Sequence, residues 1–223
     1  MKRIVAVSLL AVGLAACNHT IQANPNTVLE RYGYLQQVPP VAEHGPGTLV
    51  WRRTIPQPPT RYASLGYICR PEFTADAGAP ISSPTERSAI GRELNASFNL
   101  TGAEVASFGI GAAAQYVNKV TLSFENVEVQ EYPLETLARI RSSLGPECKR
   151  ILREQIRKDN AYQVVSVIKA DVTYNVEFKS GASLSAKAEA LTAIGAKLGF
   201  DAARSDGTAG KGLYYGVALE SQT

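Results

Sequence analysis

The segment from Gln163 to Lys179 constrains the fold of this chain more than any other. Apolar side chains alternate there with polar ones, with Ile168 to Phe178 on one face and Lys169 to Lys179 on the other. A period of two residues predicts a strand that is buried on one face only. One solvated face is typical of an antiparallel sheet. At about 3.3 Å per residue the strand would span roughly 50 Å, so the sequence predicts a sheet with long strands.

The rest of the chain adds strands and helices to this sheet. Similar patterning predicts further strands, which fall at 48–54, 62–70, 94–101, 105–110, 116–129 and 213–219. The apolar positions shift by one residue after Asn126, which is typical of a β-bulge. Helical spacing predicts helices, which fall at 133–144, 147–158 and 183–198. This order of elements predicts an α+β fold with helices packed on one face of an antiparallel sheet.

The first seventeen residues have the form of a processing segment. Lys2 and Arg3 precede a charge-free apolar run of 13 residues, Ile4–Ala16. The run is too short for a transmembrane helix, which needs about 20 residues, and it matches a secretory signal peptide. It ends in the sequence Leu14-Ala15-Ala16-Cys17, which resembles the lipobox of bacterial lipoproteins.

The resemblance implies diacylation of the Cys17 thiol, cleavage before Cys17 and usually acylation of the new amino group, with fatty acids such as palmitate. Two or three acyl chains give stable anchoring, whereas one chain holds only marginally. In the lipoproteins that this segment resembles, Asp directly after the cysteine favours retention at the inner membrane. Asn18 stands at that position here, which implies the outer membrane, with the domain facing the periplasm. The alternative is an ordinary signal peptide with a chance cysteine. We therefore expect a signal peptide at 1–16, a Pro/Asn-rich tether at 17–47 with a short helix near 27–32, and a single domain at 48–223.

Charge argues against a nucleic-acid partner. The chain has 23 basic and 20 acidic residues, a net charge of +3, and cleavage removes two of the basic residues, leaving +1. An exported chain of nearly neutral charge does not fit nucleic-acid binding.

The remaining cysteines, Cys69 and Cys148, form an even pair. Disulfides persist in the compartment that an exported protein reaches, so we predict a disulfide across the 79 residues between position 69 and position 148. Two buried thiols remain the alternative. We expect His19 and His44 to be exposed, and no Cys or His lies at ligand spacing from another, so no metal and no cofactor is predicted.

No motif in the sequence assigns a catalytic residue. Gly109–Ala114 matches G-x-G-x-x-A but lies between predicted strands, where a turn or a close packing crossing is the better interpretation. Gly207–Gly212 has the wrong spacing for a phosphate loop. Asp171 and Glu177 share the polar face of one strand, but they lie too far apart along it to form a close carboxylate pair. The sequence therefore favours a protein without catalytic activity.

A basic stripe marks the predicted helix at 147–158. Lys149, Arg153 and Arg157 are spaced by four residues and lie opposite the apolar face of this helix. We hypothesise that the stripe meets an anionic partner, such as lipid head groups or another envelope polymer. The alternative is a solvated face in which Glu154 pairs with Arg150 and Lys158.

Three functions are compatible with these features. The first is a lipid-anchored envelope protein whose domain binds another envelope protein or polymer through the polar sheet face or the basic helix. The second is a membrane-active protein whose long strands rearrange into spanning hairpins in many copies, helped by small residues at Ala96, Ser97, Gly109, Gly111 and Ala112. The third is a hydrolase of envelope polymers that uses dispersed carboxylates.

Overall fold

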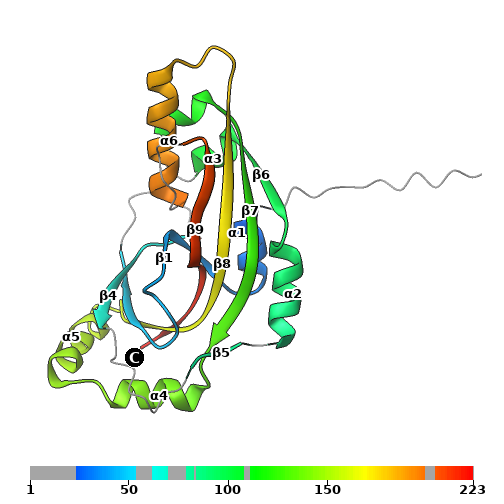
Figure 1. The fold of residues 1–223 in the computed structure, drawn as a ribbon. Coiled ribbons are helices and arrows are strands. Elements are labelled where there is room, and N and C mark those ends of the chain that lie inside the picture. The colour runs from blue at the N-terminus through cyan, green and yellow to red at the C-terminus, as the bar shows by residue number, and fades with distance from the viewer. Residues whose placement is uncertain are drawn as a thin grey trace, which may run out of the picture.

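A long-stranded antiparallel sheet organises the protein (Figure 1). The computed structural model describes residues 24–53, 62–69, 79–82, 84–107, 111–198 and 204–222. Its longest strands are β7 (Val117–Glu131), β8 (Tyr162–Phe178) and β9 (Asp206–Ser221), and they pair antiparallel in the order β7, β8, β9. The predicted α+β class with long antiparallel strands is confirmed.

Shorter strands extend the sheet to nine. On one side, β5 (Ile81–Ser82) and β6 (Ser97–Thr101) both pair with β7. On the other side, β1 (Leu35–Val41) pairs with β9, and β3 (Tyr62–Ala63) runs parallel to β1. Near the start of β8, β2 (Leu49–Arg52) pairs with β8 and with β4 (Leu65–Cys69). The other described pairings are antiparallel, so the β1–β3 contact is a local exception.

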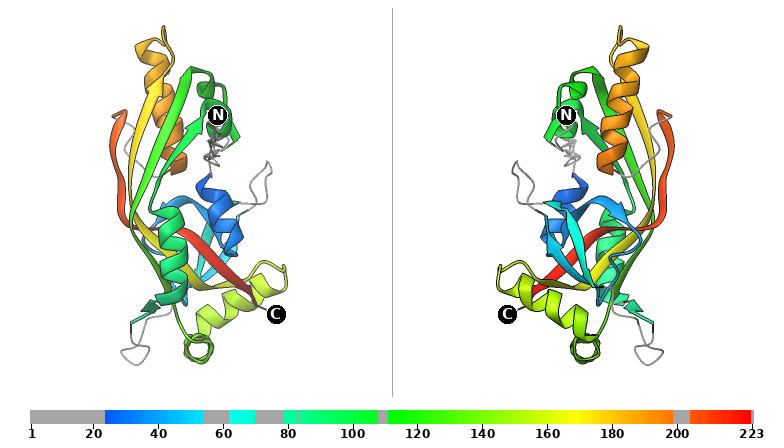
Figure 2. Two further views of the ribbon diagram at one scale, coloured as in Figure 1. Left: turned by 90° about the vertical axis from the view of Figure 1, so that its right-hand side faces the viewer. Right: turned by 90° about the vertical axis from the view of Figure 1, so that its left-hand side faces the viewer.

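The helices gather on one side and at one end of the sheet. They are α1 (Pro25–Arg31), α2 (Pro84–Leu94), α3 (Gly102–Ser107), the 3-10 helix η2 (Gly111–Tyr116), α4 (Leu134–Ser142), α5 (Pro146–Ile156) and α6 (Leu184–Leu198). Figure 2 shows β7, β8 and β9 forming one side of the molecule, with α1, α3 and α6 behind them. The helices α4 and α5 lie at the end of the molecule where the C-terminus is found (Figure 1).

The alternation of β8 explains this layering. Its even-numbered side chains from Ile168 to Val176 are buried, while Thr173 and Asn175 are exposed. The buried side shares one apolar cluster with residues of α1, α2, α3, η2 and α6, including Leu29, Ile90 and Ile194. From Ile168 to Val176, one face of β8 is therefore covered by helices and the other is solvated, as the sequence predicted. Nearer the start of β8 both faces are buried, because Val167 and Val217 belong to a second apolar cluster.

The predicted bulge is present in β7. The register between β7 and β8 shifts between Glu125 and Glu128, and Asn126 takes a positive φ of 51°. Asn tolerates this left-handed conformation better than most residues. The extra residue restores the inward orientation of Val127 and Val129, which are both buried.

The expected tether over 17–47 is wrong for most of its described part, although the short helix expected near 27–32 is present as α1. Residues 25–41 form α1 and β1, and Val28, Leu29 and Tyr34 are buried in the main core. Asn24 caps α1 by accepting a hydrogen bond from the Asn26 N–H at 3.0 Å, and a proline occupies the first turn. The prolines at 39 and 40 suggested a tether, but they lie in β1, a strand with short pairings. The fold thus begins near Asn24, not at 48.

Two further expectations were also wrong. The segment 105–110 does not return as a strand, because α3 occupies its start, and residues 108–110 lie outside the described part of the chain. A capping box begins α3: Thr101 N–H donates to Glu104 Oε2 at 2.7 Å, and Glu104 N–H donates to Thr101 Oγ1 at 3.3 Å. The strand expected from residue 94 begins at Ser97, because buried Leu94 ends α2, a helix that the sequence pattern did not predict.

Candidate functional site

The solvated side of the sheet carries rows of short polar side chains that cross four strands. One row follows the register Ser97–Ser123–Thr173–Thr208, and the next follows Asn99–Thr121–Asn175–Asp206. We call these eight residues the polar face. Within it, the Ser97 and Ser123 hydroxyls are hydrogen-bonded at 2.7 Å, and Thr121 Oγ1 donates to Asn99 Oδ1 at 2.9 Å. Seven of the eight side chains carry no charge, so the face is mostly an array of hydroxyl and amide groups.

Charged groups border the polar face, and three of them, Lys119, Asp171 and Glu177, are engaged within the sheet. Lys119 and Glu177 form an ion pair at 2.8 Å. Asp171 accepts hydrogen bonds from Asn126 Nδ2 at 2.8 Å and from the Gly212 N–H at 2.7 Å, which joins the β7 bulge to β9. These bonds, Asn126 first, lower the pKa of Asp171. Glu125 is the register partner of Asp171, but a carboxyl with a lowered pKa is a poor proton donor, which argues against a hydrolytic pair here.

The Asp171 contacts give a pH-dependent contribution to stability. Since the folded pKa lies below the ordinary value of 3.8, the contribution is present above that value and is lost as the pH falls through the folded pKa. We expect the stability difference between wild type and Asp171→Asn to be largest above about pH 5 and to shrink below about pH 4. Urea unfolding over a pH series measures it. Asn126→Ala should weaken the pH dependence, and a difference that does not change with pH would contradict the assignment.

The basic stripe is exposed on α5, as the helical spacing predicted. Arg150 pairs with Glu147 at 2.8 Å, and Lys158 pairs with Glu154 at 3.0 Å. The expected Glu154–Lys158 pair is therefore present, while Arg150 takes Glu147 as its partner instead. In the described part of the chain no ion pair joins Lys149, Arg153 or Arg157 to a carboxylate, although Arg157 contributes weakly, after Lys158, to the lowered pKa of Glu154.

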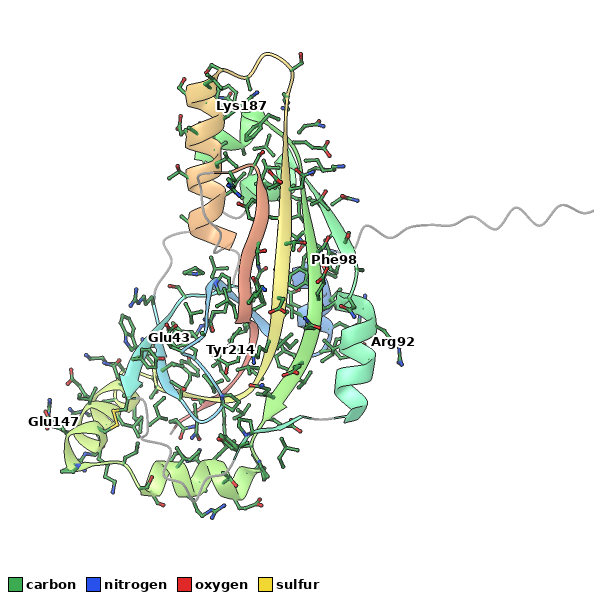
Figure 3. The ribbon with its side chains drawn as sticks, in the orientation of Figure 1. Glu43, Arg92, Phe98, Glu147, Lys187 and Tyr214 are labelled. Carbon is green, nitrogen blue, oxygen red and sulfur yellow. A yellow bond between two sulfur atoms is a disulfide. The ribbon has the colours of Figure 1, made fainter. Side chains whose placement is uncertain are left out.

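The apolar side of α5 fixes the direction of the stripe. Cys148, Ile151, Leu152 and Ile156 pack against a cluster that contains Leu49 and Ile68. A disulfide joins Cys148 to Cys69 at the end of β4, with the two Cα atoms 5.9 Å apart, which confirms the predicted pairing. It is the yellow bond near Glu147 in Figure 3. Because one side of α5 is bonded to the sheet, the stripe must face solvent.

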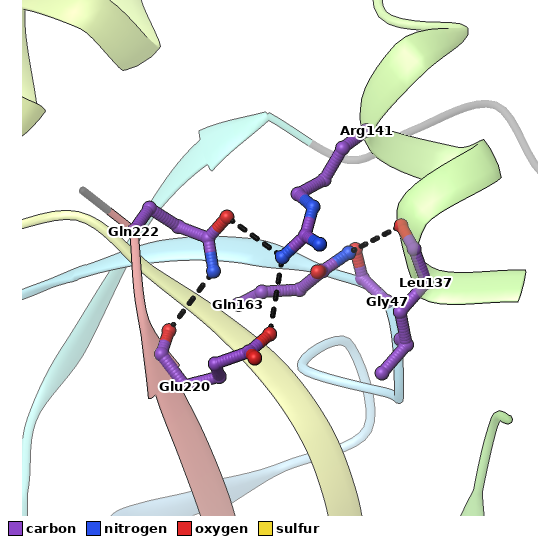
Figure 4. A network of polar contacts seen from close by, with 6 residues as sticks. All are labelled: Gly47, Leu137, Arg141, Gln163, Glu220 and Gln222. Atoms are coloured by element: carbon purple, nitrogen blue, oxygen red, sulfur yellow. Dashed lines mark hydrogen bonds and ion pairs between the residues drawn. The ribbon is translucent and has the colours of Figure 1, made fainter. Parts of the chain in front are cut away.

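The neighbouring helix α4 is attached to the sheet by a network of hydrogen bonds (Figure 4). Arg141 Nη1 donates to Glu220 Oε2 and to Gln222 Oε1, each at 3.0 Å. Gln163, which is fully buried, donates from Nε2 to the carbonyl oxygens of Gly47 and Leu137, each at 3.3 Å. These bonds tie α4 to the ends of β8 and β9, so α4 and α5 form one rigid end of the protein.

Two of the remaining predicted residues, Cys17 and His19, lie outside the described residues. The expected exposure of His44 is wrong: its ring is buried and lies edge-on to Tyr67 at 4.7 Å, and burial lowers the pKa of the imidazole. In the G-x-G-x-x-A segment, Ala113 and Ala114 are buried in η2, which fits the packing interpretation. Within the described ranges, no cluster of three His, Cys, Asp or Glu side chains is arranged to hold a metal ion.

Comparison with known proteins identifies no family. No family model and no curated protein matches this chain. Among solved structures, the chain is similar to a bacterial gasdermin from Bradyrhizobium tropiciagri, with 16% identity, a TM-score of 0.38, and coverage of 87% of this chain and 85% of the other. Similarity at this level establishes neither a family nor a function. Among the described helices, none combines the length and the apolar character needed to span a bilayer.

Proposed function

We propose that this chain is a lipid-anchored cell-envelope protein whose domain binds another envelope component, a protein or a polymer, without catalysing a reaction. The anchor would be the acylated Cys17, at an outer membrane and facing the periplasm. The polar face would be the surface that meets the partner.

The uncovered polar face is the observation that carries this proposal. Helices cover the apolar side of β7, β8 and β9 (Figure 2), whereas Thr173 and Asn175 on the other side of β8 are exposed. That other side is buried only nearer the start of β8, where Val167 and Val217 cluster with residues of β2 and β4. Neighbouring strands lie about 4.8 Å apart, so a partner can contact hydroxyl and amide groups of several strands at once. Thr173, Asn175 and Thr208 are exposed, and their donors and acceptors are available to such a partner.

The short distance between Cys17 and the fold supports this orientation. Because the fold begins near Asn24, the chain between them reaches at most about 25 Å. The helix α1 lies on the helix-covered side of the sheet (Figure 2). An acyl group on Cys17 would keep that side near the bilayer, and the polar face would then point away from it.

Site-specific photocross-linking in intact cells tests the proposal. A photoreactive amino acid at Thr173 should capture one recurrent heterologous partner, identified by mass spectrometry, because its side chain lies in the polar face. The matched control places the same group at Ala188, which is exposed on α6 on the opposite side, and it should not capture this partner. The Cys17→Ser variant should leave the membrane fraction and lose the cross-link.

Two outcomes would contradict the proposal. Capture from Ala188 as efficient as from Thr173 would show that the polar face is not the contact surface. Self-cross-links alone would point to an assembly of this chain with itself.

A membrane-active function is the second candidate, and the alternation of the long strands favours it. Each of β7, β8 and β9 has 15 to 17 residues, more than the 9–11 or so that cross a bilayer. In β7 and β8 one side is apolar and the other polar, and helices connect the three strands in sequence. Failure of the chain to release dye from anionic vesicles over a range of concentrations would remove this candidate.

A further inference from the structure

We propose that Lys149 and Arg153 on α5, together with its C-cap residue Arg157, dock this end of the protein onto anionic lipid head groups. The inference rests on the proposed function in one respect, because the anchor at Cys17 would bring the domain to a bilayer.

The charge balance of α5 supports an anionic partner. Residues 146–158 contain five cations, Lys149, Arg150, Arg153, Arg157 and Lys158, against Glu147 and Glu154. Both carboxylates are already paired with cations of the same segment, Arg150 and Lys158. The net positive charge of the segment is therefore carried by Lys149, Arg153 and Arg157, and all three side chains are exposed.

The geometry of α5 presents these charges together. Side chains spaced by four residues lie on one side of a helix, and with a rise of 1.5 Å per residue the stripe is about 12 Å long. The opposite side of α5 is fixed by the Cys69–Cys148 disulfide and by its apolar contacts. The charges are thus held on a rigid outer surface, which suits a flat partner.

Exposed apolar side chains at the same end favour a lipid surface over an acidic protein. Leu134, the first residue of α4, is 71% exposed, and Ile81 is 53% exposed. They lie close together, because Ile81 is the register partner of Glu131, three residues before Leu134. They lie at the same end of the molecule as α5, with the length of α4 between them and α5 (Figure 1). Basic and apolar side chains exposed at one end are typical of proteins that bind the membrane interface.

The distance to the anchor also favours lipid. Attraction to anionic head groups acts only within a Debye length of the surface, about 8 Å at physiological salt. The chain from Cys17 to Asn24 reaches at most about 25 Å, so the anchor would keep the domain near the bilayer, and α5 would come within this range when it turns toward the surface.

Vesicle co-sedimentation with residues 18–223 tests the inference. This chain retains every described element of the fold and lacks the acylation site. It should bind phosphatidylcholine vesicles that contain phosphatidylglycerol, release at high salt, and bind pure phosphatidylcholine vesicles weakly. Replacing Lys149, Arg153 and Arg157 by alanine should lower the partition coefficient by at least about tenfold.

Three variants make the result specific. Alanine at Lys179 and Arg204, exposed near the far end of the sheet, and at Lys211, exposed in β9 opposite the middle of β8, removes the same charge and should leave binding unchanged. The exchange Lys149→Arg, Arg153→Lys and Arg157→Lys keeps the charge and should keep binding. Leu134→Ser should weaken binding less than loss of the stripe does.

The opposite results would overturn the inference. Equal binding to both kinds of vesicle, no binding to either, or an equal loss in the control variant would each exclude docking through the stripe. Palmitate labelling of the full chain and of its Cys17→Ser variant tests the anchor separately. A failed vesicle experiment with positive labelling would therefore reject the docking surface and leave the proposed anchor in place.

Discussion

Replacing Cys69 and Cys148 together by alanine should lower the free energy of unfolding by about 4 kcal/mol. The disulfide closes a loop of 79 residues, and in the chain-entropy model a cross-link over such a loop removes many conformations of the unfolded chain. The loop contains β5, β6 and β7, so one of the three long strands lies between the two joined positions. Urea unfolding followed by circular dichroism and by the fluorescence of Trp51 measures the loss.

Two controls separate the cross-link from the loss of two sulfur atoms. Wild-type protein unfolded in the presence of a reductant should resemble the double variant. The Cys17→Ser variant should unfold like wild type, because Cys17 is not one of the two bonded cysteines. A double variant within about 1 kcal/mol of wild type would contradict the prediction, since removal of a native disulfide typically costs about 2–5 kcal/mol.

Leu29→Ala should destabilise the protein by about 2–5 kcal/mol. Leu29 lies on α1, is 2% exposed, and belongs to the main apolar cluster under β7 and β8. Truncation removes apolar contacts and leaves a cavity that the surrounding strands cannot close. The free energy of unfolding from urea titration is again the measurement.

Thr27→Ala is the matched control for this prediction. Thr27 lies on the same helix two residues away but is exposed, so its replacement should change stability by no more than about 0.5 kcal/mol. If both variants were equally close to wild type, residues 25–31 would behave as the tether that the prolines suggested, and the core would begin later in the chain.

Local patterns predicted those parts of the fold that depend on local chemistry. The alternation in β8, the bulge at Asn126 and the three helices after β7 each have a complete signal within a few residues. The start of α3 had such a signal too, since Thr101 and Glu104 have the spacing of a capping box, but the following apolar residues suggested a strand. The proline-rich β1 had no local signal for a strand. Its structure depends on pairing with β9, which lies far away in the sequence.

The candidate sites were also predictable only as far as they depend on residues close together in the sequence. Helical spacing alone placed Lys149, Arg153 and Arg157 on one side of α5. The ion pairs on α5 depend on side-chain geometry, which the sequence does not show. Arg150 pairs with Glu147 and not with Glu154. Each row of the polar face depends on the lateral register of four strands. Register is set by turns and by core packing across the sheet, so no single strand contained that information.

The position of β9 in the sheet has a consequence for how the protein is made. This last strand lies between β1 and β8, and Leu35 near the start of the fold pairs with Val217 near its end. Contacts between such distant residues slow folding, because a long loop must close first. The sheet cannot be completed until the final residues have left the ribosome. A chain with a secretory leader would thereby stay incompletely folded during synthesis, in a form that can still be threaded through a membrane, and would close its sheet on the far side.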